Sequence, residues 1–259
     1  MKIAVLGATG RAGSAIVAEA RRRGHEVLAV VRDPQKAADR LGATVATLVK
    51  EPLVLTEADL DSVDAVVDAL SVPWGSGRGY LHLDFATHLV SLLRNSDTLA
   101  VFILGSASLA MPGADHPMIL DFPESAASQP WYDGALYQYY EYQFLQMNAN
   151  VNWIGISPSE AFPSGPATSY VAGKDTLLVG EDGQSHITTG NMALAILDQL
   201  EHPTAIRDRI VVRAADSMLV QRLKKATLQL PEAMLGRSKL PFAIFAWWTI
   251  KDGKRACFR

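Results

Sequence analysis

The fold of this chain is decided by the stretch KIAVLGATGRAG at residues 2–13. Its first five residues form a mostly apolar run that is typical of a buried strand, and the rest is a glycine-rich turn. A helical stretch follows at 14–23, and a second apolar run at 27–31 ends shortly before Pro34. A strand, a glycine-rich turn, a helix and a second strand in this order predict a βαβ unit that holds a dinucleotide.

The three glycines of the turn have separate expected roles. Gly7 allows the tight turn after the strand, Gly10 lets the backbone approach a pyrophosphate, and Gly13 lets the helix pack close to the strand. The helix N-terminus offers free N–H groups and a partial positive charge to the phosphates. The residues expected to hold the pyrophosphate are therefore Gly7, Thr9, Gly10, Arg11, Ala12 and Gly13. A tight turn without a ligand is the alternative interpretation.

The residue that follows the second strand predicts which cofactor binds. NAD-binding units carry an acidic residue near this point, which accepts the ribose 2′-OH. This chain has Arg32 there, and a guanidinium can pair with a 2′-phosphate as a planar fork. We therefore expect NADP(H) rather than NAD(H). Two alternatives remain: Asp33 reaches a ribose hydroxyl, or Arg32 is a solvated surface arginine before the turn at Pro34.

The rest of the chain alternates between strand and helix patterns. We expect strands at 43–49, 64–70, 99–104, 152–157 and 210–213, helices at 34–41, 80–94, 132–147 and 190–200, a capped helical turn at 56–59 and a hairpin around 181–184. This order predicts an α/β protein with a Rossmann-type doubly wound parallel sheet and a small C-terminal substrate lobe. Ligands of such sheets bind beyond the carboxyl ends of the strands.

The distribution of charge divides the chain. Residues 218–259 hold nine Lys and Arg against two acids, a net charge of +7, whereas the whole chain carries −3. We therefore expect an NAD(P)-binding Rossmann domain at 1–216, with 158–213 forming the substrate-side lobe, and a basic, tryptophan-containing extension at 217–259. The apolar segment 240–250 of the extension predicts a dimer or core-docking element; an interfacial membrane segment is the alternative.

Composition excludes several classes of protein. The single cysteine, Cys257, rules out a disulfide framework or a cysteine metal site within one chain. The small net charge gives no argument for nucleic acid, and no apolar run approaches the ~20 residues of a membrane span. The first apolar run is too short for a signal peptide, so we expect a cytoplasmic protein. The histidines at 82, 88, 116 and 186 lack metal-ligand spacing, and no metal is expected.

The chain resembles the atypical short-chain dehydrogenases/reductases, and within them the bacterial NADH-flavin reductases and NmrA-like NAD(P)-binding proteins. The segments that carry the resemblance are residues 7–13, 30–34, 64–70, 104–109, 152–158 and 183–193. It covers about residues 1–215. It implies an NAD(P)H-binding Rossmann domain that reduces a flavin, a quinone or another small acceptor. It also implies a cofactor site that includes Lys50, Glu51, Leu70, Ser71, Gly105 and Ser106.

One departure from the superfamily bears on mechanism. Most members use a Tyr-x-x-x-Lys pair on the helix after the fifth strand, where the lysine lowers the pKa of the tyrosine so that it can transfer a proton. This chain has five tyrosines between 132 and 142, but no lysine stands four residues after any of them, and none occurs from 51 to 173. Dehydrogenase and nucleotide-sugar epimerase chemistry therefore loses its usual proton-transfer group.

A flat redox acceptor tolerates this loss, because hydride can pass directly to a ring held in stacking contact. The sequence therefore predicts an NADPH-dependent oxidoreductase acting on a flavin such as FMN, or on a quinone. The candidate catalytic residues are Ser106, Ser108 and Tyr139, and Trp74 is a candidate stacking surface. The alternative is a non-catalytic NADP(H)-binding redox sensor of the NmrA-like type. A nucleotide-sugar isomerase is less favoured.

Overall fold

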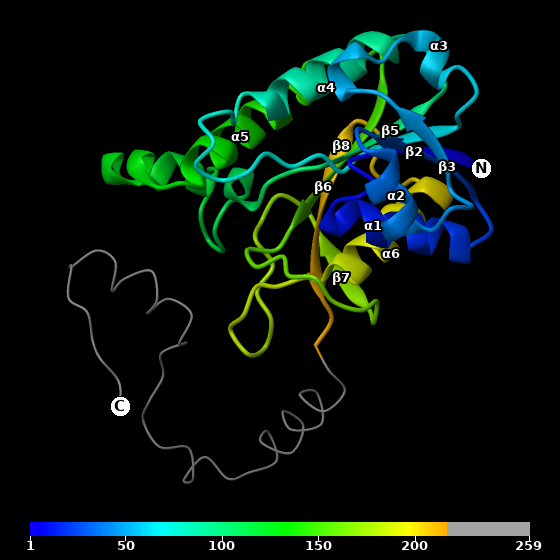
Figure 1. Ribbon diagram of the computed structural model, residues 1–259. Helices are drawn as coiled ribbons and strands as arrows, with labels where there is room; N and C mark the ends of the chain where they lie inside the picture. Colours follow the sequence, from blue (N-terminus) through cyan, green and yellow to red (C-terminus); the bar gives the residue numbers. More distant parts are fainter. Residues whose placement is uncertain (217–259) are drawn as a thin grey trace, which may run out of the picture.

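The computed structural model describes residues 1–216, and in them an eight-stranded sheet has the order β3-β2-β1-β4-β5-β6-β8-β7 (Figure 1). Neighbouring strands are parallel except β7 and β8, which run antiparallel. The strands are β1 (Lys2–Leu6), β2 (Glu26–Val31), β3 (Ala46–Val49), β4 (Ala65–Asp68), β5 (Leu99–Ile103), β6 (Asn152–Pro158), β7 (Tyr170–Gly173) and β8 (Asp208–Ala214). The predicted Rossmann-type parallel sheet is confirmed.

Helices cover both faces of the sheet (Figure 1). One face packs against α1 (Arg11–Arg22), α2 (Pro34–Leu41) and α6 (Thr189–Glu201), and the other against α3 (Glu57–Leu60), α4 (Leu81–Leu92) and α5 (Tyr132–Gln146). Short 3₁₀ helices connect them: η1 (Pro52–Val54), η2 (Ser106–Ser108), η3 (Met118–Asp121) and η4 (Glu124–Ser128). Both layers therefore belong to one folded unit.

The apolar runs of the sequence form the central strands of the sheet. These strands are buried on both faces and so make up much of the core. In β1, Ile3 and Val5 face the α1 and α6 layer, whereas Ala4 and Leu6 face the α4 and α5 layer. All four side chains are at most 2% exposed. A continuous apolar run, rather than an alternating one, is the pattern that such a strand requires.

The hairpin predicted for the region after β6 needs correction. The expected hairpin around 181–184 is a turn, closed by the N–H of Gly180 on the carbonyl of Gln184 at 2.7 Å, but no strands flank it. The antiparallel partner of β8 is instead β7, which the sequence did not predict. This strand has only four residues and no buried face, so it carries no apolar alternation. Residues 158–213 also supply α6 and β8 to the main core.

Other predicted elements are confirmed with ends displaced by a few residues. The capped turn at 56–59 is α3, in which the Thr56 backbone N–H and hydroxyl both donate to the Asp59 carboxylate at 2.7 Å. The predictions for residues 217–259 lie outside the described residues. In the part that the structure describes, no helix is long and apolar enough to cross a membrane.

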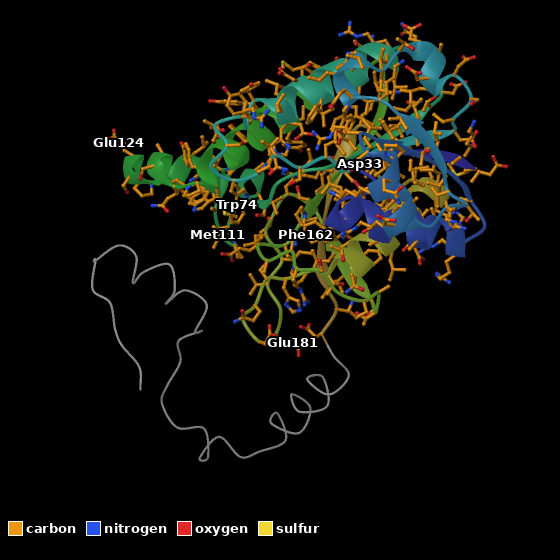
Figure 2. All side chains as sticks on the ribbon, in the orientation of Figure 1. Asp33, Trp74, Met111, Glu124, Phe162 and Glu181 are labelled. Carbon is orange, nitrogen blue, oxygen red and sulfur yellow. The ribbon has the colours of Figure 1, made fainter. Side chains whose placement is uncertain are left out.

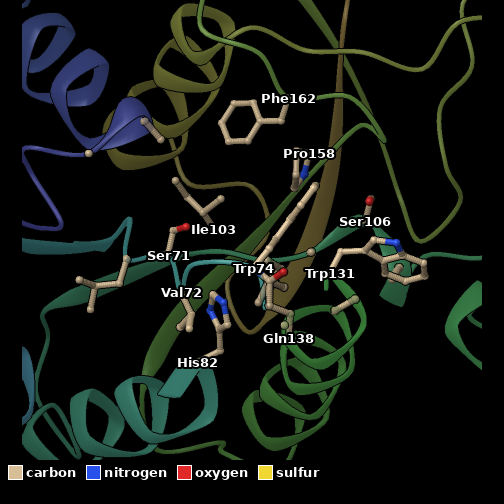
Figure 3. A pocket seen from close by; sticks show the side chains of 18 of the residues that line it. Ser71, Val72, Trp74, His82, Ile103, Ser106, Trp131, Gln138, Pro158 and Phe162 are labelled. Atoms are coloured by element: carbon tan, nitrogen blue, oxygen red, sulfur yellow. The ribbon is translucent and has the colours of Figure 1, made fainter. Parts of the chain in front are cut away.

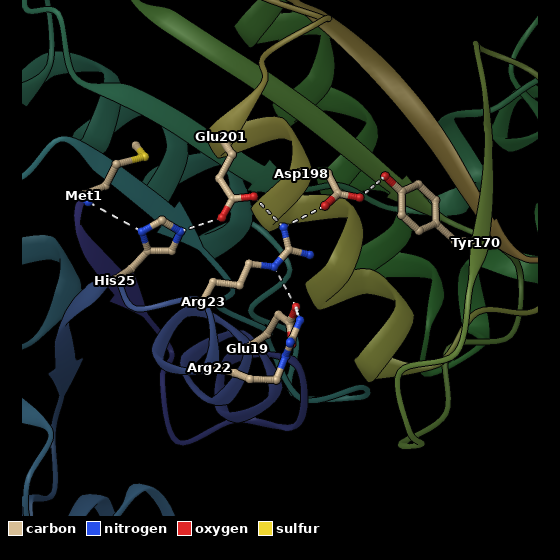
Figure 4. A network of polar contacts seen from close by, with 8 residues as sticks. All are labelled: Met1, Glu19, Arg22, Arg23, His25, Tyr170, Asp198 and Glu201. Atoms are coloured by element: carbon tan, nitrogen blue, oxygen red, sulfur yellow. Dashed lines mark hydrogen bonds and ion pairs between the residues drawn. The ribbon is translucent and has the colours of Figure 1, made fainter.

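An ionic network joins α1 to α6 (Figure 4). Arg23, which follows α1, donates to Glu19 of α1 and to Asp198 and Glu201 of α6, each at 2.7 Å. The hydroxyl of Tyr170 in β7 donates to Asp198 at 2.7 Å. Because the Arg23 side chain is only 15% exposed, water screens these contacts less than it screens surface ion pairs. The network ties α1 to the last helix that packs on the sheet.

Two carboxyl groups lie buried between the sheet and α5. Burial raises the pKa of Asp68, at the end of β4, to about 6, while the Leu70 N–H that donates to it at 2.9 Å opposes the shift. Burial, and next the charge of Asp68, raise the pKa of Glu141 on α5 well above its ordinary value. One oxygen of Glu141 has no hydrogen-bond partner. The interior therefore favours both groups in their neutral forms.

The raised pKa of Asp68 predicts a stability that falls with pH. The folded state keeps a proton that the unfolded chain releases near pH 4, so this contribution is complete below about pH 4 and is lost as pH rises through about 6. Asn at position 68 keeps an acceptor for Leu70 and cannot ionise. In urea unfolding we expect Asp68→Asn to gain roughly 2–3 kcal/mol over the parent protein at pH 8, and little at pH 4.

The exposed carboxylate of Asp61 supplies the matched control for this measurement. Asp61→Asn removes the same charge at the surface and is expected to leave the pH dependence of stability unchanged. If the two variants behave alike at pH 8, burial does not raise the pKa of Asp68.

Candidate cofactor and acceptor pocket

The glycine-rich loop is shaped by close backbone contacts. Gly7 has φ +72°, and a Cβ there would lie 2.7 Å from the carbonyl oxygen of Ala69, after β4. A Cβ on Gly13 would lie 2.2 Å from the carbonyl oxygen of Gly7. Real side chains do not occupy such distances, so both positions require glycine. The loop and the first turn of α1 therefore stand directly over the end of β4.

The start of α1 is suited to an anion. Its N-cap, Gly10, provides no side-chain hydrogen bond, and the first turn contains no acidic residue. The N–H of Gly10 donates to the carbonyl of Gly7 at 2.8 Å, which closes the turn. A helix N-terminus left uncapped in this way presents its N–H groups and the positive end of the helix dipole to a ligand.

A pocket of about 1760 Å³ opens at the carboxyl ends of the strands, where the strand order reverses between β1 and β4. Most of the predicted cofactor residues line it: Gly7, Thr9, Gly10, Arg11, Ala12, Arg32, Lys50, Leu70, Ser71, Gly105 and Ser106. Gly13 instead lies behind the loop, where it allows α1 to pack. Glu51 lines a smaller adjoining pocket of about 200 Å³, together with Arg32.

One end of the pocket is cationic. Arg32 and Lys36 line it, and neither forms an ion pair within residues 1–216. Lys50 also lines it, but its ammonium contacts the Asp59 carboxylate at 2.6 Å and lowers the pKa of Asp59 to about 2. Asp33 caps α2 by accepting the Lys36 N–H at 3.0 Å and does not line the pocket. The alternative role of Asp33 as a ribose ligand is not supported by this geometry.

The other end of the pocket is bounded by α5, and the sequence did not indicate which face α5 presents. The residues there are Trp131, Gly134, Ala135 and Gln138, whose spacing is that of one helical face. None of the five tyrosines of α5 lines the pocket. Gln138 lies against the backbone of Gly105, where a Cβ would meet its Oε1 at 2.7 Å. A side chain at position 105 would therefore require Gln138 to shift.

Two predicted catalytic residues are directed away from the pocket. The Ser108 hydroxyl is buried, donates to the carbonyl of Gly105 at 3.0 Å and accepts from Arg209 Nη1 at 2.9 Å. The Tyr139 hydroxyl accepts from Gln143 Nε2 at 2.9 Å on the exposed side of α5. Neither residue lines the pocket. Of the three candidates, only Ser106 is brought to the pocket.

Two further residues line the pocket that the sequence motifs did not indicate. His82 of α4 and Gln138 of α5 both point into it (Figure 3). Burial lowers the pKa of His82 to about 4, despite the opposing charge of Asp133, so its imidazole is neutral at pH 7. Trp74, which is 76% exposed, lies in the loop after β4 on the α5 side of the molecule (Figure 2).

The comparisons with known proteins agree with this geometry. A family model described as NAD(P)H-binding matches residues 7–203. The chain belongs to this NAD(P)H-binding family. It is 35% identical over 215 residues to the uncharacterized protein YwnB of Bacillus subtilis (strain 168), and the match covers 82% of this chain and 98% of YwnB. The residue range of the family extends from the glycine-rich loop to just beyond α6.

Two solved structures resemble the fold over nearly their whole length. SP1627 of Streptococcus pneumoniae TIGR4, named "a putative NADH-flavin reductase", is 30% identical with a TM-score of 0.73, covering 83% of this chain and 99% of SP1627. A "putative epimerase" of Bacteroides thetaiotaomicron is 26% identical with a TM-score of 0.70, covering 83% of this chain and 98% of that one. The resemblance predicted from the sequence motifs is confirmed. Among the described residues no cluster of His, Cys, Asp or Glu could hold a metal ion.

The two inner glycines of the loop are expected to respond differently to alanine. At position 13 the new Cβ meets a backbone atom at 2.2 Å, whereas at position 10 the nearest atom is 3.0 Å away. We expect Gly13→Ala to destabilise the fold by roughly 1–3 kcal/mol through overpacking, measured by thermal unfolding without cofactor. Gly10→Ala should fold but bind cofactor more weakly. Equal melting temperatures for the two variants would contradict this assignment.

Proposed function

We propose that the protein is an NADPH-dependent oxidoreductase that reduces a flat redox acceptor, such as a flavin or a quinone, by direct hydride transfer. The observation that carries this proposal is one continuous pocket with a phosphate-binding loop at one end and an aromatic, tyrosine-free α5 wall at the other. A reaction that needs a tyrosine proton donor on α5 lacks that group here. Hydride transfer to a conjugated ring does not need it.

The preference for NADPH is supported by the cationic end of the pocket. Arg32 follows β2 and Lys36 lies in the first turn of α2, so both reach the point where the ribose of an adenosine would lie. No acidic side chain among the described residues lines this end. A 2′-phosphate would find two positive charges there, and the Glu51 carboxylate lines only the adjoining small pocket. This preference differs from the NADH in the name of SP1627.

A bound nicotinamide supplies the hydride, and the residues of the chain bind and orient the cofactor and the acceptor. The loop at 7–13 holds the pyrophosphate, while Ser71 and Ser106 offer hydroxyls to the nicotinamide side of the pocket. Gln138 presents an amide that can donate to a carbonyl of the acceptor, and neutral His82 can do the same. Catalysis is then mainly proximity and orientation in a partly dry pocket, with solvent supplying the proton.

The first test is NADPH oxidation by the purified full-length protein, offered FMN, riboflavin and a small quinone separately. Saturable turnover that Gly10→Ala weakens would support a reductase. Tight NADPH binding without turnover of any acceptor would contradict it. That result would favour the rival function, a redox sensor of the NmrA-like type that acts on a protein partner, because a sensor also needs no Tyr-x-x-x-Lys pair.

Replacement of Arg32 tests cofactor choice. We expect Arg32→Ala to weaken NADPH binding by ~1.5–3 kcal/mol, the cost of a charge-assisted contact, and to affect NADH little. Arg40→Ala is the matched control, because Arg40 is an exposed arginine of α2 that does not line the pocket. Titration of both cofactors measures the effect. An equal loss of affinity for NADPH and NADH would show that Arg32 does not bind the 2′-phosphate.

Replacement of Gln138 tests the α5 wall. Leu at position 138 keeps the approximate volume but removes the amide, and we expect kcat/KM for the acceptor to fall about tenfold, the cost of one hydrogen bond. Tyr139→Phe is the neighbouring control, and it should retain activity because the Tyr139 hydroxyl contacts Gln143 outside the pocket. If Tyr139→Phe abolished turnover instead, the original prediction of Tyr139 as a catalytic residue would be restored.

A further inference from the structure

The pocket has more volume than one small ligand needs. Ligand sites commonly measure about 300–1,000 Å³, and this pocket measures about 1760 Å³. Its lining divides along the sequence: the phosphate-binding loop, β2 and α2 form one part, and η2 to α5 form the other. We call the second part the acceptor end and define it by Ser106, Met118, Asp121, Phe122, Trp131 and Gln138.

The acceptor end is aromatic and apolar in its centre. The rings of Phe122 and Trp131 meet edge to face, with centroids 5.2 Å apart, and Met118 lines the same part. Trp74 overhangs the pocket from the loop after β4 (Figure 3). Flat ring faces and a thioether of this kind favour a planar conjugated ligand.

The basic groups of the pocket all lie away from the acceptor end. The lysines and arginines among the described lining residues are Arg11, Arg32, Lys36 and Lys50. Arg32, Lys36 and Lys50 belong to the cationic end, and Arg11 begins α1, where it donates to the carbonyl of Phe162 at 2.9 Å. The adjoining small pocket adds Arg78, again beside Arg32. In the large pocket, the described lining residues from 51 to 163 include no lysine or arginine.

The charge that the acceptor end does carry is negative. Asp121 lines it. His116 lies between Asp121 and Asp115, with a ring nitrogen 2.9 Å from each carboxylate. Those two carboxylates raise the pKa of His116, yet one imidazolium cannot neutralise both. A net negative charge therefore remains beside the acceptor end whether His116 is protonated or not.

We propose that the acceptor end selects flat acceptors without a phosphate group, such as riboflavin or a quinone, and disfavours phosphorylated flavins such as FMN. This inference rests on the proposed function and specifies its substrate class. The ring system of riboflavin and FMN is the same, so stacking on the aromatic side chains does not distinguish them. The FMN phosphate, by contrast, finds carboxylates and no basic side chain among the described residues at this end.

The expected size of the preference follows from Coulomb's law. Like charges about 8 Å apart in a partly wet cleft repel by roughly 1 kcal/mol or more, which corresponds to a preference of about tenfold for the uncharged flavin. Because part of the site is exposed, salt should screen the effect. A preference that came only from shape would not depend on salt.

The experiment measures flavin binding directly, without turnover. Full-length protein saturated with NADP⁺ is titrated with riboflavin and with FMN, and the quenching of flavin fluorescence gives the two Kd values. We expect riboflavin to bind about tenfold more tightly at low salt, with a smaller ratio at high salt. Equal affinities, tighter binding of FMN, or no binding of either flavin would overturn the inference.

Charge variants separate electrostatics from shape. Asp121→Asn removes a carboxylate from the acceptor end, and Ser125→Lys adds an ammonium on an exposed lining residue of η4. Both should shift the ratio of the two Kd values toward FMN, with the larger shift for Ser125→Lys. Ser125→Gln controls for side-chain size. Asp97→Asn controls for net charge, because Asp97 precedes β5 and lies at the opposite ends of the strands.

Turnover provides a separate readout, so the two proposals fail in different ways. If NADPH is oxidised equally well with FMN and riboflavin, and the Kd values agree, the reductase stands and the acceptor selectivity is wrong. If riboflavin binds preferentially but neither flavin nor quinone is reduced, the selectivity stands and the reductase is wrong.

Discussion

The structure depends on how closely α1 approaches the loop that leads into it. The carbonyl of Gly7 lies where a side chain of Gly13 would be, and the turn itself fits against the backbone after β4. This approach brings the positive end of α1 to the point where the sheet changes direction. Every other part of the pocket is arranged around that point, since the ends of β2, β4, β5 and β6 all open toward it. A bulkier residue at either glycine would separate the helix from the strands and open the phosphate site.

Much of this arrangement could be predicted from the sequence because it is local. A glycine pattern between two apolar runs specifies the βαβ unit, and parallel strands bring Arg32, Leu70 and Gly105 to one edge of the sheet. The wall of the pocket that η2 and α5 form could not be predicted in the same way. Ser108 follows a strand end as Ser106 does, but Arg209, a hundred residues later, holds its hydroxyl in the interior. The orientation of α5 likewise depends on its packing against α4 and on burial of Glu141, and a helix with five tyrosines gives no clear apolar face.

Burial shifts the pKa of three ionisable groups in the pocket and in the interior beneath it toward the neutral form. The pKa of Asp68 is raised to about 6 and that of Glu141 is raised well above its ordinary value, whereas the pKa of His82 is lowered to about 4. Such groups reduce stability at neutral pH, since an apolar residue of similar size would have no ionisation to suppress. Of the three, only His82 lines the pocket, and its neutral imidazole adds no charge there. Charge is left at its two ends, positive beside β2 and negative beside η3.

The Arg23 network has a consequence for how the chain reaches its native state. Arg23 and Asp198 are 175 residues apart, and the helices that they join are the first and the last of the described fold. Closing so long a loop costs entropy that local contacts cannot recover, so α1 gains its full support only after α6 has emerged from the ribosome. The glycine-rich loop, although encoded in the first thirteen residues, therefore lacks this support until α6 has been synthesised. A chain truncated before α6 would carry the complete glycine motif and still lack the support that holds it in shape.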